Sequence, residues 1–163
     1  MTNEEILDTI EKEAHDYELK YHGCSRCALR PIQEHLKLGD GWALKAATPL
    51  AAGIGMRGET CGALLGGIMA IGMVTASEDF ADEAKLSEAL TAAYRYWRRF
   101  VKEFGSPRCR DIQLAKVGRY YDLSDIRQYE EAREKGFYDV VSNVVGKASR
   151  MAAQMIVEQL GKK

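Results

Sequence analysis

Four cysteines carry the chemistry that this sequence could perform. Cys24 and Cys27 form a Cys-x-x-Cys pair, and Cys61 and Cys109 stand alone. A Cys-x-x-Cys pair serves as a redox dithiol, as half of a metal site or, with a histidine directly after it, as a haem attachment point. Two thiols that only pack are the remaining alternative, because free cysteine is among the most buried residue types.

The residues around the pair argue against two of these uses. Ala28 follows Cys27 at the place where covalent haem attachment needs a histidine. Zinc sites favour a second Cys-x-x-Cys pair or two closely spaced histidines, and His15, His22 and His35 lack that spacing. Convergence of four sulfurs in space stays open.

The two single cysteines are expected at helix starts. Ser106 is a good N-cap and Pro107 suits the first helical position, so Cys109 falls in the first turn. Thr60 can cap a helix that opens with Cys61. Free amide groups and the helix dipole favour negative charge there, so we expect lowered thiol pKa values and reactive thiolates. Ordinary or raised pKa values would favour packing instead.

The Cys-x-x-Cys pair lies close to a proline. Pro31 lacks the amide N–H that would bond to the carbonyl of Cys27, and it biases Arg30 away from helical geometry. We therefore expect the pair in a kinked first turn or in the loop just before the helix. Arg26 adds positive charge beside it.

Glycines line one face of the segment that begins near Cys61. Gly58, Gly62 and Gly66 follow one another at four-residue steps, so another helix or a cofactor can approach this face closely. We name these three as candidate cofactor-binding residues, with helix packing within the chain or across a dimer as the simpler explanation. Residues 53–58 read Gly-x-Gly-x-x-Gly, but no β-strand pattern precedes them, so we do not expect a dinucleotide site.

Apolar residues recur at helical spacing along nearly the whole sequence. Leu86, Leu90 and Trp97 belong to one such stripe, and no segment alternates with period two between hairpin turns. The sequence therefore predicts an all-α bundle of about seven to eight helices. Their expected positions are 3–20, 25–38, 41–52, 60–75, 79–104, 107–116, 123–134 and 138–160.

Length and charge limit the class of protein. A chain of 163 residues suits a single domain over 1–163, and 23 Lys and Arg against 24 Asp and Glu predict no nucleic-acid partner. The acidic N-terminus lacks the pattern of a secretory signal, and the uncharged stretch 60–77 reads as a buried helix rather than a membrane span. We expect a cytoplasmic protein, where four cysteines do not naturally form a disulfide framework.

Residues 61–66, CGALLG, resemble the CGAxxG signature of a redox-active family named C_GCAxxG_C_C. Cys27 before the signature and Cys109 after it are similar to the family pattern in the same order. The resemblance implies a small helical protein with four characteristic cysteines and a redox role, without a defined reaction. The last family cysteine would fall at 140–142, where this chain has none, whereas Cys24 is extra.

We therefore predict a site in which Cys27, Cys61 and Cys109 converge. Cys24 is either a fourth member that replaces the missing cysteine or a bystander of a three-cysteine site. The thiolates would hold an iron–sulfur cluster or another soft metal, or would exchange disulfides with an unknown redox partner. The competing hypothesis is a homodimeric binding or scaffold protein whose glycine-rich helix forms the interface and whose cysteines only pack. A small-molecule pocket above the glycine face is a third.

Overall fold

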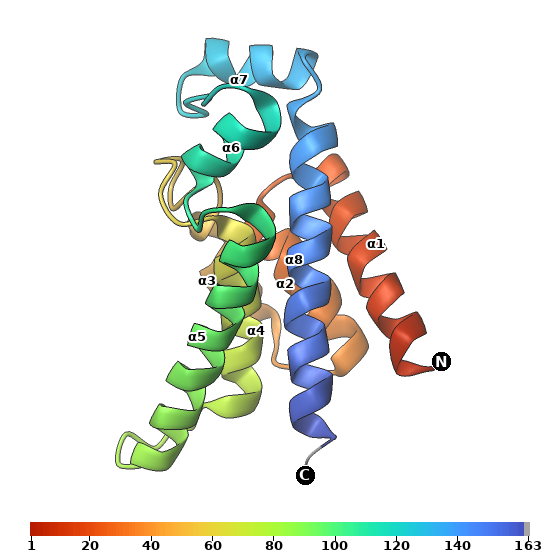
Figure 1. The fold of residues 1–163 in the computed structure, drawn as a ribbon, viewed down its shortest axis with the longest axis vertical. Coiled ribbons are helices and arrows are strands. Elements are labelled where there is room, and N and C mark those ends of the chain that lie inside the picture. Colours follow the sequence, from red (N-terminus) through yellow and green to blue (C-terminus); the bar gives the residue numbers. More distant parts are fainter. Residues whose placement is uncertain (162–163) are drawn as a thin grey trace.

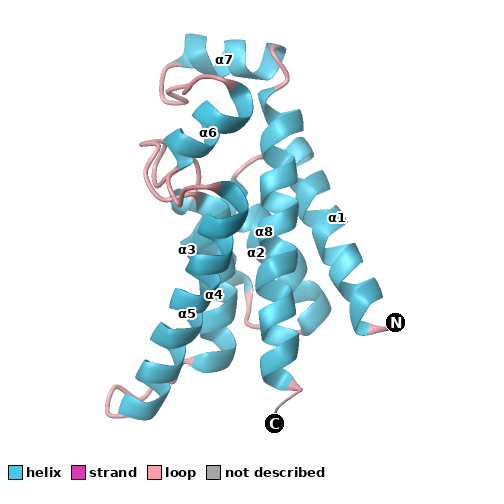
Figure 2. Ribbon diagram, viewed as in Figure 1, coloured by secondary structure: helices cyan, strands magenta, loops and turns pink. Residues whose placement is uncertain are grey.

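The computed structural model describes residues 1–161, and Figure 2 shows helices joined by loops. Within those residues there is no strand, and the only β-type pairing is an isolated antiparallel bridge between Thr60 and Arg108. The predicted all-α fold and the upper estimate of eight helices are confirmed. The helices are α1 (Asn3–Tyr21), α2 (Cys24–Leu36), α3 (Gly41–Ala47), the 3-10 helix η1 (Thr48–Leu50), α4 (Gly62–Thr75), α5 (Glu83–Phe104), α6 (Cys109–Val117), α7 (Ile126–Glu134) and α8 (Phe137–Leu160).

Local capping and proline explain where the helix boundaries differ from expectation. The Asp82 side chain accepts the amide N–H of Lys85 at 2.9 Å, so α5 begins after this N-cap rather than near residue 79. The helix expected over 41–52 stops at Ala47, because Pro49 has no N–H to continue the α-helical pattern and a 3-10 turn follows. Boundaries set by a single side chain are less predictable than the helices themselves.

The long helix α8 runs through the middle of the molecule, with α1 along one side and α5 at the opposite edge (Figure 1). Its most extensive contacts are with α1 and α4, and α2 packs mainly on α4. The short helices α6 and α7 cover one end, beside the loop that precedes α4. No helix within residues 1–161 combines the length and the apolar character needed to cross a bilayer.

The glycine face of α4 is covered by α2 of the same chain. A Cβ added at Gly66 would clash with the carbonyl oxygen of Ser25, and one added at Gly62 would clash with the sulfur of Cys24. Gly58 lies in the preceding loop, against the ring of Tyr120. Packing within the chain therefore occupies the surface for which we considered a cofactor, a small-molecule pocket or a dimer partner.

Candidate functional site

A short backbone pairing brings Cys61 and Cys109 together. Each follows one residue of the bridge between Thr60 and Arg108, and the amide groups of the two cysteines make its hydrogen bonds. The Cys61 N–H donates to the carbonyl oxygen of Pro107 at 2.8 Å, and the Cys109 N–H donates to that of Glu59 at 2.6 Å. Side chains alternate along a β-bridge, so the two thiols project from the same face. The bridge thus joins two cysteines that are far apart in sequence.

Both cysteines lie at helix starts, close to the expected positions. Cys61 is the N-cap of α4 and Cys109 is the first residue of α6. Ser106 stands two residues before the N-cap, where its hydroxyl accepts the N–H of Arg108 at 3.1 Å. Both helix starts therefore lie within two residues of the predicted positions, but the predicted caps are wrong: neither Thr60 nor Ser106 is the N-cap, and neither N-cap side chain makes a capping hydrogen bond.

Cys24 opens α2 and lies against the start of α4. Its sulfur accepts the amide N–H of Ala52 at 3.4 Å, and the absence of a side chain at Gly62 lets α4 approach it closely. Cys24 and Cys27 lie in the first turn of α2, which is one of the two positions that we expected for the pair. The helix continues through Pro31.

Three thiols at the starts of three different helices line one cavity of about 80 Å³. They belong to Cys24, Cys61 and Cys109, and the wall also includes Glu18 and Val141. Val141 falls within 140–142, the stretch where the family resemblance places its missing last cysteine. The cavity therefore combines three thiols with an apolar side chain at the expected fourth position.

Cys27 does not line this cavity. It lies on the floor of a separate groove of about 480 Å³ between α1, α2 and α3, whose other lining residues include Tyr17, Arg26 and Lys45. Its side chain is 3% exposed, and its thiol donates to the carbonyl of His22 at 3.2 Å. The structure thus brings together three of the four cysteines that we named, with Cys24 in the place for which the sequence favoured Cys27.

Glu18 joins the two thiol environments, and the sequence reasoning did not single it out. It is 3% exposed, lines the cysteine cavity, and is close enough to Cys27 for that side chain to influence its pKa. Its Oε2 atom has no hydrogen-bond partner within residues 1–161. One signal could have identified it: Ile10, Ala14 and Glu18 follow at four-residue steps on the buried face of α1.

Burial also sets the protonation of Glu18. It raises the pKa of this carboxyl group from an ordinary value of 4.5 to about 7, against the opposing effects of the Cys27 side chain and the Arg26 charge. The group therefore changes charge near neutral pH, directly beside the thiols. Perturbed ionisable groups in cavities are frequent features of functional sites.

The expected lowering of the thiol pKa values is wrong, and by that criterion alone the raised values favour thiols that only pack. Burial raises the pKa of all four thiols, that of Cys61 to about 12 and that of Cys24 well above its usual value. The loss of solvation exceeds the favourable effect of a helix start. At Cys109 the side-chain amide of Gln113, 3.3 Å from the sulfur, and the charge of Arg110 oppose the increase.

The loop beside Cys24 has an unusual backbone. Ala52, Gly53, Ile54, Gly55 and Met56 have consecutive φ values of 53°, 71°, 64°, 55° and 65°. A left-handed conformation costs about 1–2 kcal/mol per non-glycine residue. The Gly-x-Gly-x-x-Gly sequence therefore supports a strained left-handed turn against a cysteine, and such strain concentrates at functional sites.

The cavity residues do not fit a metal centre in this arrangement. Between residues 1 and 161, no group of three or more His, Cys, Asp or Glu side chains is placed to hold a metal ion. Iron–sulfur clusters and structural zinc sites commonly use four such ligands, and the fourth position here is Val141. All four cysteines are free thiols.

Comparison with known proteins supports a redox assignment at the level of the family. No curated protein and no solved structure shows significant similarity to the chain. A family model described as "Putative redox-active protein (C_GCAxxG_C_C)" matches residues 22–155. That match spans all four cysteines and most of the sequence, and the chain therefore belongs to the C_GCAxxG_C_C family of redox-active proteins.

Proposed function

We propose that this chain transfers electrons by thiol–disulfide exchange in the cavity of Cys24, Cys61 and Cys109. The observation that carries the proposal is the shared cavity: free thiols at the starts of three helices lie beside a buried carboxyl group with an unpartnered oxygen. Packing alone does not require a carboxyl group there, since burying one without a full set of partners costs free energy.

Cys109 is the attacking thiol in this proposal. It is half-buried, whereas Cys61 is 7% exposed, and Gln113 and Arg110 favour its thiolate form. Its thiolate attacks one sulfur of an external disulfide, so that a mixed disulfide forms, the substrate S–S bond breaks and the first substrate thiol leaves.

Cys61 is the resolving thiol. Its thiolate attacks the Cys109 sulfur of the mixed disulfide, a bond between the two cysteines forms, and the second substrate thiol leaves. The protein loses two electrons and two thiol protons, and the external disulfide is reduced to two thiols. Cys24 lies beside Cys61 and is the alternative resolving partner.

Glu18 is the proton acceptor for this exchange. Its carboxyl group lines the cavity and has an oxygen without a partner, and its pKa near 7 makes the carboxylate available at neutral pH. A base whose pKa lies near the working pH can accept a proton as the thiol attacks. We assign the protein to the cytoplasm, where reducing conditions keep such thiols free.

Thiol counting with peptide mapping tests the proposal. The reduced chain is equilibrated in glutathione buffers of increasing oxidised fraction, and we expect the free thiols to fall from four to two, with Cys61 linked to Cys109 in mass spectra. Cys109→Ser should abolish this loss of free thiols, whereas the matched variant Cys27→Ser should still lose two.

Two results would contradict the proposal. Four thiols that stay free in the most oxidising buffer, while the helical circular dichroism is unchanged, would exclude exchange in the folded chain. A link confined to Cys24 and Cys27 would show that the cavity is not the redox site.

A further inference from the structure

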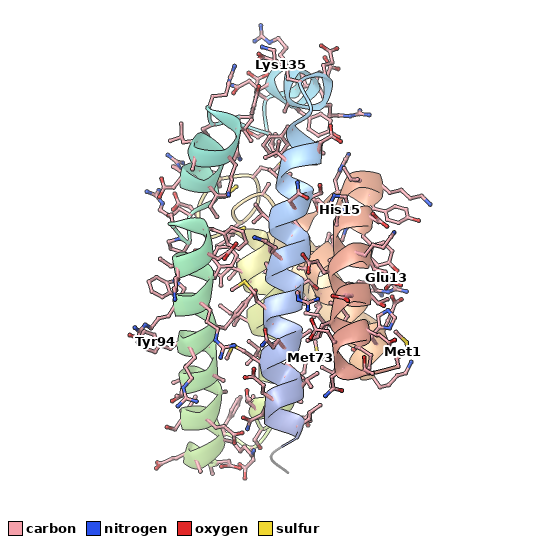
Figure 3. All side chains as sticks on the ribbon, turned by 45° about the vertical axis from the view of Figure 1, so that its right-hand side comes forward. Met1, Glu13, His15, Met73, Tyr94 and Lys135 are labelled. Atoms are coloured by element: carbon pink, nitrogen blue, oxygen red, sulfur yellow. The ribbon has the colours of Figure 1, made fainter. Side chains whose placement is uncertain are left out.

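An exposed apolar stripe runs along α5. Leu86, Leu90, Tyr94 and Trp97 are 59%, 63%, 59% and 39% exposed, and they follow one another at steps of four, four and three residues. This spacing places them on one side of the helix. In Figure 3, Tyr94 projects away from the bundle, and α5 forms an edge of the molecule in Figure 1.

The stripe is separate from the residues that attach α5 to the bundle. Tyr96, Phe100 and Phe104 are the buried residues of this helix, and the hydroxyl group of Tyr96 donates to the carbonyl of Ala148 at 2.9 Å. The stripe therefore adds apolar area that the fold itself does not use. Contiguous exposed apolar patches of this kind mark interaction sites.

The charges along this segment are divided between its two ends. Residues 78–83 carry four acidic side chains and no basic one, and residues 94–102 carry four basic side chains and no acidic one. They are Glu78, Asp79, Asp82 and Glu83 at the first end, and Arg95, Arg98, Arg99 and Lys102 at the second. Only Arg99 of these eight forms an ion pair within residues 1–161, with Glu158 at 3.7 Å.

We propose that α5 forms the interface of a symmetric homodimer in which the two copies of this helix pack antiparallel. A twofold axis between Leu90 and Tyr94 places the stripe of one copy on that of the other. The same axis brings the acidic end of each helix near the basic end of its partner, whereas parallel helices would place like charges together. The proposal does not depend on the redox chemistry, and it moves the interface expected on α4 to α5.

The stripe is tested by charge insertion and measurement of the oligomeric state. The reduced chain should be a dimer by sedimentation equilibrium. Leu90→Glu should weaken the dimer by about 100-fold or more, because one central apolar contact is lost twice in a symmetric interface. Leu114→Glu, at a leucine on α6 with 54% exposure, is the matched control and should not change the dissociation constant.

The antiparallel arrangement is tested by a charge swap. Arg98→Glu or Glu83→Arg alone should weaken the dimer by about tenfold, as expected for loss of charge-assisted contacts. The double variant should recover affinity, because each reversed charge then faces a reversed charge on the other copy. Circular dichroism checks that each variant is folded.

Three results would overturn the proposal. A chain that stays monomeric up to its solubility limit does not use α5 for a second copy, and the face would then belong to a different partner. A dimer that Leu90→Glu leaves intact has its interface elsewhere. A double variant with the summed loss of both single variants rules out the antiparallel pairing.

Discussion

Replacing Glu18 with glutamine should change how the stability of the fold depends on pH. The rise in the pKa of this carboxyl group from 4.5 to about 7 corresponds to about 3 kcal/mol of preference for the protonated form in the folded chain. Glutamine is nearly the same size and stays neutral, so Glu18→Gln removes this dependence while it keeps the packing.

The sign follows from proton binding in the two states. Between about pH 4.5 and 7 the folded chain holds a proton on Glu18 that the unfolded chain has lost, so stability falls as pH rises through this window. The stability that this bound proton contributes is fully present below about pH 4.5 and is lost above about pH 7. We expect Glu18→Gln to be more stable than the unchanged chain above this window, by up to about 3 kcal/mol.

Urea unfolding of the reduced chains at several pH values measures the difference. Thiol ionisation does not interfere in this range, because burial raises the pKa of every cysteine above its ordinary value. Glu134→Gln, at an exposed position on α7, is the control and should keep the slope of the unchanged chain. Parallel stability curves for Glu18→Gln and the unchanged chain would refute the assignment of a strongly perturbed carboxyl group.

Three further changes test the remaining features of the site. Gly66→Ala should destabilise the fold by about 1–3 kcal/mol or more, because its Cβ meets the α2 backbone, whereas Gly72→Ala, with no heavy atom within 4 Å of an added Cβ, should be neutral or stabilising in the same urea titration. Iodoacetamide labelling followed by mass spectrometry should modify Cys109 first, at a rate that still increases above pH 9, and equal labelling of all cysteines at neutral pH would contradict the burial argument. Val141→Cys gives the cavity four thiols, so we expect it to bind Co²⁺ with a thiolate-to-metal absorption band that the unchanged chain lacks; no band would show that the missing cysteine alone does not explain the lack of a metal site.

The helices were predictable because their signals are local. Apolar spacing of three and four residues and side chains such as Asp82 act within one or two turns, so the sequence predicts helix number and order. The choice between Cys24 and Cys27 is not local. The two lie in the same turn of α2, and only the docking of this helix on α4 decides which thiol faces Cys61.

The protonation of the thiols was not predictable for a related reason. A helix start lowers a thiol pKa, and that effect can be read from capping residues around Cys61 and Cys109. Burial raises the pKa, and its extent depends on chain segments that are distant in sequence. Glu18 shows the same limit, because its position on an apolar stripe indicates burial but not the neighbours it meets.

The raised thiol pKa values indicate what kind of redox protein would result. A thiol of high pKa is a poor leaving group, so a disulfide between Cys61 and Cys109 would be attacked slowly by external thiols. The buried position of Cys61 slows that attack further. Fast turnover is therefore not expected from this cavity. In the proposed exchange the oxidised state would therefore be long-lived, because forming and reversing it would need both proton transfer through Glu18 and access by a docked partner.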